Sequence, residues 1–158
     1  MKYNETSQPF TPNFSNWPIN SPERFIHGCW QLNMMRFHAF SYECRNELWD
    51  TYRRINHELG AQTAQLDLLD LEKDDRKKSH IMNIIQNKEQ PTWIWFINCE
   101  ALLDTSLAGW LRSTLTTNDT AHIRVTFLLN SQEHYRGIFQ RYSAPLYKST
   151  IALNLQTS

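Results

Sequence analysis

The sequence predicts an α/β fold in which helices cover a mostly parallel sheet. Short apolar runs, as is typical of buried strands, stand at residues 66–71, 92–97, 123–129 and 150–155. The stretches between these runs carry apolar residues at helical spacing and are long enough to cross over between parallel strands. Since such crossovers are right-handed, we expect a three-layer α/β/α sandwich around four or five strands.

The length and charge of the chain restrict the classes of protein to which it can belong. Its 158 residues suffice for one hydrophobic core. Sixteen basic and sixteen acidic residues cancel, so no overall field draws the protein to nucleic acid or to an anionic membrane. No apolar run reaches the roughly 20 residues of a membrane span, and the three cysteines lack the spacing of a zinc site. We therefore expect a cytoplasmic protein with no membrane partner.

The first half of the chain is less regular than the second. Residues 1–22 are polar and rich in proline, which predicts a flexible or docking N-terminal arm before a single α/β domain at 23–158. Residues 25–32 are a candidate first strand. Ser41 is a candidate N-cap for a long helix, because apolar residues then recur at helical spacing until Gly60.

The second half alternates strand and helix more clearly. We expect helices between the strands, beginning at Asp74, at Asp104 or Thr105, and at Ser131. Acidic or hydroxyl side chains stand at these positions, where they can bind the free N–H groups of a first helical turn. The strand at 92–97 is apolar on both faces, which places it in the middle of the sheet.

Aromatic residues are abundant, with six Trp, six Tyr and eight Phe. Most are expected in the core, since aromatic side chains bury large apolar areas. Those outside the regular segments are better suited to contact a partner, because Trp and Tyr are frequent at the energetic centres of interfaces. The candidate partner surface comprises Trp17, Trp30, Met34, Met35 and Arg36. It predicts binding to another protein, and a homodimer through an exposed aromatic face is one form of that binding.

A turn at residues 28–36 occupies the position where nucleotide-binding α/β domains hold phosphate, between the expected first strand and the long helix. Such loops need several glycines, so that backbone N–H groups approach the anion, followed by a lysine. This turn has one glycine, Gly28, and no lysine. We therefore predict no cofactor-binding and no catalytic residues here.

The order of the elements resembles the core of AAA-type P-loop ATPases. Residues 93–103 (WIWFINCEALL) are similar to the Walker B strand of that family, and residues 123–131 (IRVTFLLNS) to its sensor strand, with Asn130 at the polar end. Asn98 and Cys99 replace the acidic pair before a single Glu100. The resemblance implies a P-loop-NTPase-like topology in a degenerate relative that does not hydrolyse ATP.

Polar residues at the ends of the expected strands form a second candidate site, which comprises Asp70, Asn98, Glu100 and Asn130. The carboxyl ends of parallel strands are where α/β proteins bind ligands. Asp67 and Asp70 lie three residues apart in one expected strand, so we expect them to point to opposite faces. His80 and His134 have no companion ligand at metal-binding spacing, so no metal site is predicted.

A competing resemblance centres on residues 103–111 (LDTSLAGWL), which are similar to the phosphorylatable D-S-S-G-L motif of STAS regulatory domains. It implies that Ser106 accepts phosphate from a kinase. Leu107 replaces the glycine of that motif, and the long helix before the strand at 66–71 departs from the family's order. From the residues alone, Ser106 is a first-turn helix residue.

These features together predict a non-catalytic regulatory or adaptor protein that binds another protein. The resemblance to degenerate NTPases implies an inhibitor or accessory factor in cell division, replication or DNA transactions. Two alternatives remain open: a STAS-like phospho-switch, and a nucleotide-binding protein without a standard phosphate loop.

Overall fold

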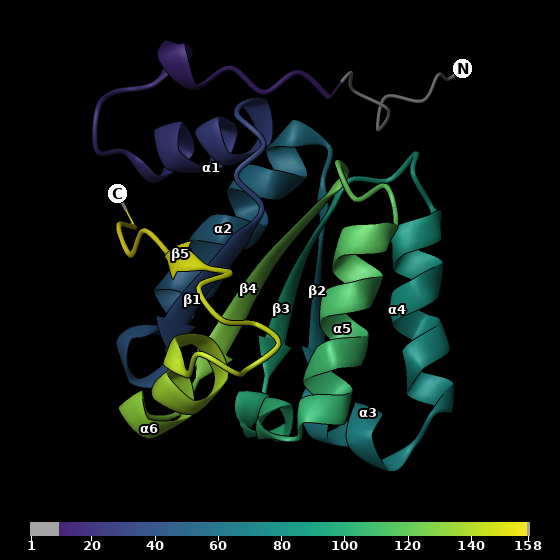
Figure 1. The fold of residues 1–158 in the computed structure, drawn as a ribbon. Helices are drawn as coiled ribbons and strands as arrows, with labels where there is room; N and C mark the ends of the chain where they lie inside the picture. The colour runs from purple at the N-terminus through teal and green to yellow at the C-terminus, as the bar shows by residue number, and fades with distance from the viewer. Residues whose placement is uncertain (1–9, 158) are drawn as a thin grey trace.

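The computed structural model, which describes residues 10–157, contains a five-stranded parallel sheet with helices on both faces (Figure 1). The strands are β1 (Arg36–Phe40), β2 (Gln62–Asp67), β3 (Thr92–Ile97), β4 (Ile123–Leu129) and β5 (Ile151–Ala152). Their order in the sheet is β2-β3-β4-β1-β5, and every pairing is parallel. The predicted α/β class is therefore confirmed.

Helices alternate with the strands along the chain. The α-helices are α1 (Pro22–Gln31), α2 (Asn46–Leu59), α3 (Leu68–Lys73), α4 (Arg76–Gln86), α5 (Thr105–Thr117) and α6 (Gln132–Tyr135). Short 3₁₀ turns form η1 (Phe14–Asn16), η2 (Ser41–Glu43) and η3 (Cys99–Leu103), and a π-helical turn, η4 (Arg136–Gln140), continues α6. Within residues 10–157, each helix is too short or too polar to cross a membrane.

The first strand lies further along the chain than predicted. Residues 25–32, the expected strand, fall in or directly after α1, and β1 begins only at Arg36. The Ser21 hydroxyl accepts a hydrogen bond from the Arg24 N–H, so an N-cap starts a helix here. The buried apolar residues of α1 then recur at helical spacing, at Ile26, Cys29 and Trp30. The cap and this spacing outweigh the apolar run that indicated a strand.

Two other strand boundaries were also predicted wrongly. The expected strand at 66–71 ends at Asp67, because the Asp67 carboxylate accepts the Leu69 N–H at 2.9 Å and caps α3. In the expected strand at 150–155, only Ile151–Ala152 pairs with the sheet. The inner strands at 92–97 and 123–129 agree with their prediction at both ends.

The direction of each crossover decides which helix covers which face. From β1, α2 leads across the sheet to β2 at the far edge, whereas the later connections move back in the opposite direction. Right-handed crossovers in opposite directions lie on opposite faces. Accordingly, α1 and α2 pack on one face, and α4, α5 and η4 pack on the other (Figure 1).

The two faces have different cores. Under α4 and α5 the core is mainly aliphatic, with phenylalanines from the strands. Under α1 and α2 it is aromatic: the Trp93 ring stacks on Phe37 with centroids 5.6 Å apart and meets Tyr52 edge-on at 5.3 Å. Trp93 Nε1–H donates to Thr126 Oγ1 at 2.8 Å. The aromatic side chains therefore pack mainly as core on this face.

An arginine lies fully buried beneath α1. Arg124 projects from β4, and its guanidinium lies 4.4 Å from the centre of the Trp30 ring. Nε donates to the Cys29 carbonyl at 3.0 Å, and the Nη atoms donate to the carbonyls of Trp30, Ala121 and Ile123 and to Asn33 Oδ1. Desolvation lowers the Arg124 pKa to about 10. The ion pairs formed within residues 10–157 do not include Arg124, so carbonyl oxygens are its principal partners.

Arg124 therefore joins the end of α1 to the middle of the sheet. Cys29 and Trp30 lie in the last turn of α1, whose carbonyls lack helical N–H partners and carry the negative end of the helix dipole. The planar guanidinium can serve several of these oxygens at once, which an ammonium group on a lysine cannot do in the same geometry.

We expect Arg124→Met to lower the free energy of unfolding by about 3 kcal/mol, because the Trp30 carbonyl would lose the guanidinium and the Cys29 carbonyl would keep only the Met34 N–H. Urea denaturation followed by circular dichroism measures this change. Arg112→Met, at an exposed arginine on α5, is the matched control and should change stability by less than about 0.5 kcal/mol. Equal effects of the two substitutions would contradict the role assigned to Arg124.

Candidate functional site at the carboxyl end of the sheet

The carboxyl ends of β1 and β4 meet at the topological switch point of the sheet. The connection after β1 leaves over one face through α2, and the connection after β4 leaves over the other through α6. In open α/β sheets, ligands bind in the crevice that this divergence leaves outside the strand ends. This end of the sheet is therefore the candidate functional site.

Three polar side chains form a hydrogen-bonded chain across the switch point. Ser41 follows β1, Asn130 follows β4, and Glu100 lies in η3 after β3. Ser41 Oγ donates to Asn130 Oδ1 at 3.0 Å, and Asn130 Nδ2 donates to Glu100 Oε1 at 3.2 Å. The Asn130 amide therefore uses both its oxygen and its nitrogen within the protein.

A tyrosine covers the same corner. The Tyr42 ring stacks on Phe40 with centroids 5.4 Å apart and 23° between the planes, and its hydroxyl accepts a bond from Gln132 Nε2 at 3.3 Å. The side chain nevertheless remains 65% exposed. Tyr42 thus links the segments that follow β1 and β4 and still presents an aromatic surface to solvent.

The loop after β1 is poorly suited to hold a phosphate. Residues 41–45 (SYECR) contain no glycine and no lysine, whereas a phosphate loop brings several backbone N–H groups and a lysine to the anion. Glu43 and Glu47 lie beside the first turn of α2, where their carboxylates repel an anion. The expected location of this loop, residues 28–36, was wrong, because the structure has the end of α1 and the start of β1 there.

The structure joins two of the four residues predicted at the strand ends. Glu100 and Asn130 are hydrogen-bonded. Asn98 precedes η3 in the left-handed conformation (φ 54°, ψ 50°), which asparagine tolerates better than most residues. Asp70 lies apart in α3. Ser41 was predicted as the N-cap of the long helix, which is wrong: it lies in η2, and α2 begins only at Asn46 with Arg45 as its N-cap. The sequence did not reveal the strand that directly precedes Ser41.

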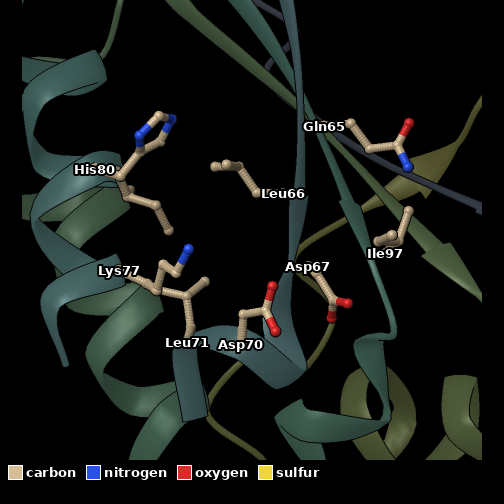
Figure 2. Close-up of a pocket in the computed structure, with 9 residues that line it drawn as sticks. Gln65, Leu66, Asp67, Asp70, Leu71, Lys77, His80 and Ile97 are labelled. Carbon is tan, nitrogen blue, oxygen red and sulfur yellow. The ribbon is translucent and has the colours of Figure 1, made fainter. Parts of the chain in front are cut away.

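Asp70 lines a cavity of about 350 Å³ beside the edge strand β2 (Figure 2). Five polar residues line it together with an apolar floor, namely Gln65, Asp67, Asp70, Lys77 and His80 over Leu66, Leu71, Ile81 and Ile97. Asp67 and Asp70 were expected on opposite faces of one strand, which is wrong: β2 ends at Asp67, so both line this cavity. Among the residues that the structure describes, no cluster of three His, Cys, Asp or Glu could hold a metal ion.

Trp30 does not belong to any partner surface. It is only 5% exposed, its Nε1–H donates to Asn56 Oδ1 at 2.8 Å, and its ring lies between Arg124 and the edge of Trp93. The prediction that it contacts a partner is wrong, because helix α1 turns it into the sheet. The helical spacing of Ile26, Cys29 and Trp30 places Trp30 on the buried face of α1, but this segment was interpreted as a strand.

The other residues of that predicted surface are half-buried. Met34, Met35 and Arg36 line a shallow cavity of about 410 Å³ together with residues 148–151. Arg36 Nη2 donates to the Leu115 carbonyl at 3.3 Å. Desolvation, and secondarily the nearby Arg112, lowers the Arg36 pKa. Trp17 lies apart from this cavity and packs on His27 with ring centroids 5.3 Å apart.

The described part of the predicted N-terminal arm packs on the domain itself. Phe10 meets the Trp30 ring edge-on at 5.1 Å, and the Phe14 N–H donates to Gln31 Oε1 at 2.9 Å. The Asn13 N–H donates to His27 Nδ1 at 3.1 Å. Residues 1–9 of the arm lie outside the described residues. Residues 10–21 therefore pack against α1.

The candidate phospho-acceptor Ser106 is exposed in the first turn of α5, where its N–H donates to Asp104 Oδ1 at 2.9 Å. Its role as an acceptor stays a prediction. The thiols are poor nucleophiles: burial raises the pKa of Cys29 to about 12 and that of Cys44 to about 11, and it raises the pKa of Cys99 further.

Comparison of the chain with family models, with curated proteins and with solved structures finds no match.

We expect the stability of the protein to fall as the pH drops below about 6.5. Burial lowers the pKa values of His27 and His38 in the folded protein below the value of about 6.5 expected in the unfolded chain. At a pH between these two values the unfolded chain binds more protons, so a fall in pH favours unfolding. Protonation would also remove the acceptor that His27 Nδ1 offers to the Asn13 N–H. Melting temperatures measured between pH 7.5 and pH 5 test this expectation.

His27→Gln keeps a neutral side chain with an acceptor, so it should flatten this pH dependence while His38 preserves part of it. His57→Gln, at an exposed histidine in α2, is the control. An unchanged pH profile in the His27→Gln variant would show that His27 is not one of the groups responsible.

Proposed function

We propose that the protein is a non-catalytic adaptor or inhibitor that binds another protein through the carboxyl end of its sheet. The observation that supports this most directly is the arrangement at the switch point. The polar groups there bond to one another, and Tyr42 covers the corner while remaining exposed. A surface of this kind suits contact with a protein better than enclosure of a small ligand, which needs a concave pocket.

The resemblance to AAA-type P-loop ATPases supports the same proposal. It assigns Glu100 to the end of a Walker B-like strand and Asn130 to the end of a sensor-like strand, and the hydrogen bond between them is compatible with those places. Without a phosphate loop after β1, a relative of that family would keep the framework and lose the nucleotide.

The charge of this end indicates the chemistry of the partner. The segments that follow β1, β3 and β4 carry Glu43, Glu100, Asp104 and Glu133, against two arginines, Arg45 and Arg136. Exposed apolar groups accompany these carboxylates, with Tyr42 65% exposed and Leu103 47% exposed. An acidic surface with an aromatic and an aliphatic contact point fits a basic protein surface and repels nucleic acid.

ATP or GTP at millimolar concentration should leave the melting temperature unchanged. A ligand that binds the native state raises that temperature by mass action, so the measurement does not require a catalytic assay. A rise that depends on nucleotide concentration would support the alternative of a nucleotide-binding protein without a standard phosphate loop.

The double variant Tyr42→Ala with Leu103→Ala should recover about tenfold less of the partner protein, or even less, because both side chains act as hot spots in the proposed interface. Affinity purification from cell extract with quantitative mass spectrometry compares it with the unchanged chain. The matched control is Ile19→Ala with Tyr142→Ala, which removes two even more exposed apolar side chains outside the three strand-end segments. If the unchanged chain, the double variant and the control variant all recover the same amounts of every interacting protein, the proposed surface is contradicted.

A further inference from the structure

The edge strand β2 lacks the features that usually protect a sheet edge. It contains neither lysine nor proline, and it pairs with β3 without a bulge over six consecutive residues. None of its residues is buried, whereas nearly all of β3 is. The opposite edge, β5, is only two residues long. A regular, uncovered edge strand is a template for a further strand.

The direction of the free backbone groups follows from the ladder. The Gln62 N–H donates to the Pro91 carbonyl, on the β3 side. Because backbone groups alternate along a strand, Gln62, Ala64 and Leu66 bond inward to β3, and Thr63 and Gln65 present N–H and C=O outward. The Asp67 N–H also points outward, whereas the Asp67 carbonyl belongs to the N-cap of α3 and faces the helix. Within residues 10–157, no other backbone segment bonds to these outward groups.

We propose that a second copy of this chain pairs antiparallel with β2, so that two sheets join into one across a two-fold axis at Gln65. In an antiparallel pair, residues that present their backbone groups to each other exchange two hydrogen bonds. Centring the axis on Gln65 pairs it with itself and pairs Thr63 with Asp67 of the second copy. Gln65 then exchanges two hydrogen bonds with its own copy, and the Asp67 N–H of each copy donates to the Thr63 carbonyl of the other.

The side chains agree with this register. Figure 2 shows Gln65 and Leu66 pointing to opposite sides of β2. On the face of α4, the register sets Ala64 opposite Leu66 of the second copy, so apolar groups meet. On the face of α2, Gln65 meets its own copy, and two amides can hydrogen-bond to each other.

The symmetry of this register favours a second copy as the occupant of this edge, because Gln65 faces itself and the apolar Ala64 faces Leu66. Charges lie at both ends of the strand. The start of β2 adjoins a cavity lined by Arg53 and Arg54, which form exposed ion pairs with Asp50 and Glu58, and the end of β2 adjoins Asp70 and Lys77. Exposed ion pairs of this kind contribute little, so the arginines of one copy remain available to Asp67 of the other. The proposal stands independently of the function proposed above.

Sedimentation velocity of the full chain over a wide range of concentration tests the dimer. Gln65→Lys sets two like charges opposite each other at the axis, without affecting the β3 ladder, and should raise the dimer dissociation constant about tenfold or more. Gln86→Lys, at an exposed glutamine in α4, adds the same charge elsewhere and should leave it unchanged. The proposal is overturned if the chain is monomeric at every concentration, or if Gln65→Lys leaves the dimer dissociation constant unchanged.

Disulfide trapping tests the register. Gln65→Cys should cross-link to itself under mild oxidation, because the two substituted positions face each other with Cα atoms about 5.5 Å apart. Thr63→Cys should not cross-link to itself, because it faces Asp67 instead. The reverse result, or equal cross-linking at both positions, overturns the register. A monomeric chain that instead binds extended peptides would assign the edge to a different protein.

Discussion

The buried guanidinium of Arg124 is the contact on which the arrangement of the first half of the protein depends. It bonds to the last carbonyls of α1 from a strand almost one hundred residues later in the chain, and it lies against the Trp30 ring. Carbonyl oxygens at a helix C-terminus carry partial negative charge, so they can accept a buried cation where a carboxylate is missing. This contact turns Trp30 inward and delivers the chain to β1 beside β4.

The position of β1 in turn creates the candidate site. Because β1 lies between β4 and β5, its crossover runs against all later ones, and the strand ends of β1 and β4 diverge there. The side chains at that corner are bonded internally, through Ser41, Asn130 and Glu100. These three side chains thus bond to one another within the protein. The exposed side chains around them, such as Tyr42 and Leu103, are the part of the site available to a partner.

The sequence predicted the central strands β3 and β4 well, whereas it misplaced the inner strand β1 and the bounds of the edge strands β2 and β5. β3 and β4 are buried on both faces, so nearly every residue is apolar and their bounds are visible in the pattern. β2 at the edge reads QTAQLD, which carries little such pattern, and the apolar run that follows it belongs mostly to α3. The same error separated Asp70 from the site to which it was assigned and joined it to Asp67 in one cavity.

By itself, then, the sequence determined the α/β class, the central strands, the long helix α2 and the lack of a glycine-rich loop, because these depend on local spacing and residue type. Only the tertiary structure decided that Trp30 packs on Arg124, that β1 begins at Arg36 and that Ser41 meets Asn130. Those outcomes depend on contacts between residues about 90 positions apart, such as the bond from Ser41 to Asn130 and those from Arg124 to α1. Local periodicity contains no information on which distant side chain will supply the missing hydrogen-bond partner.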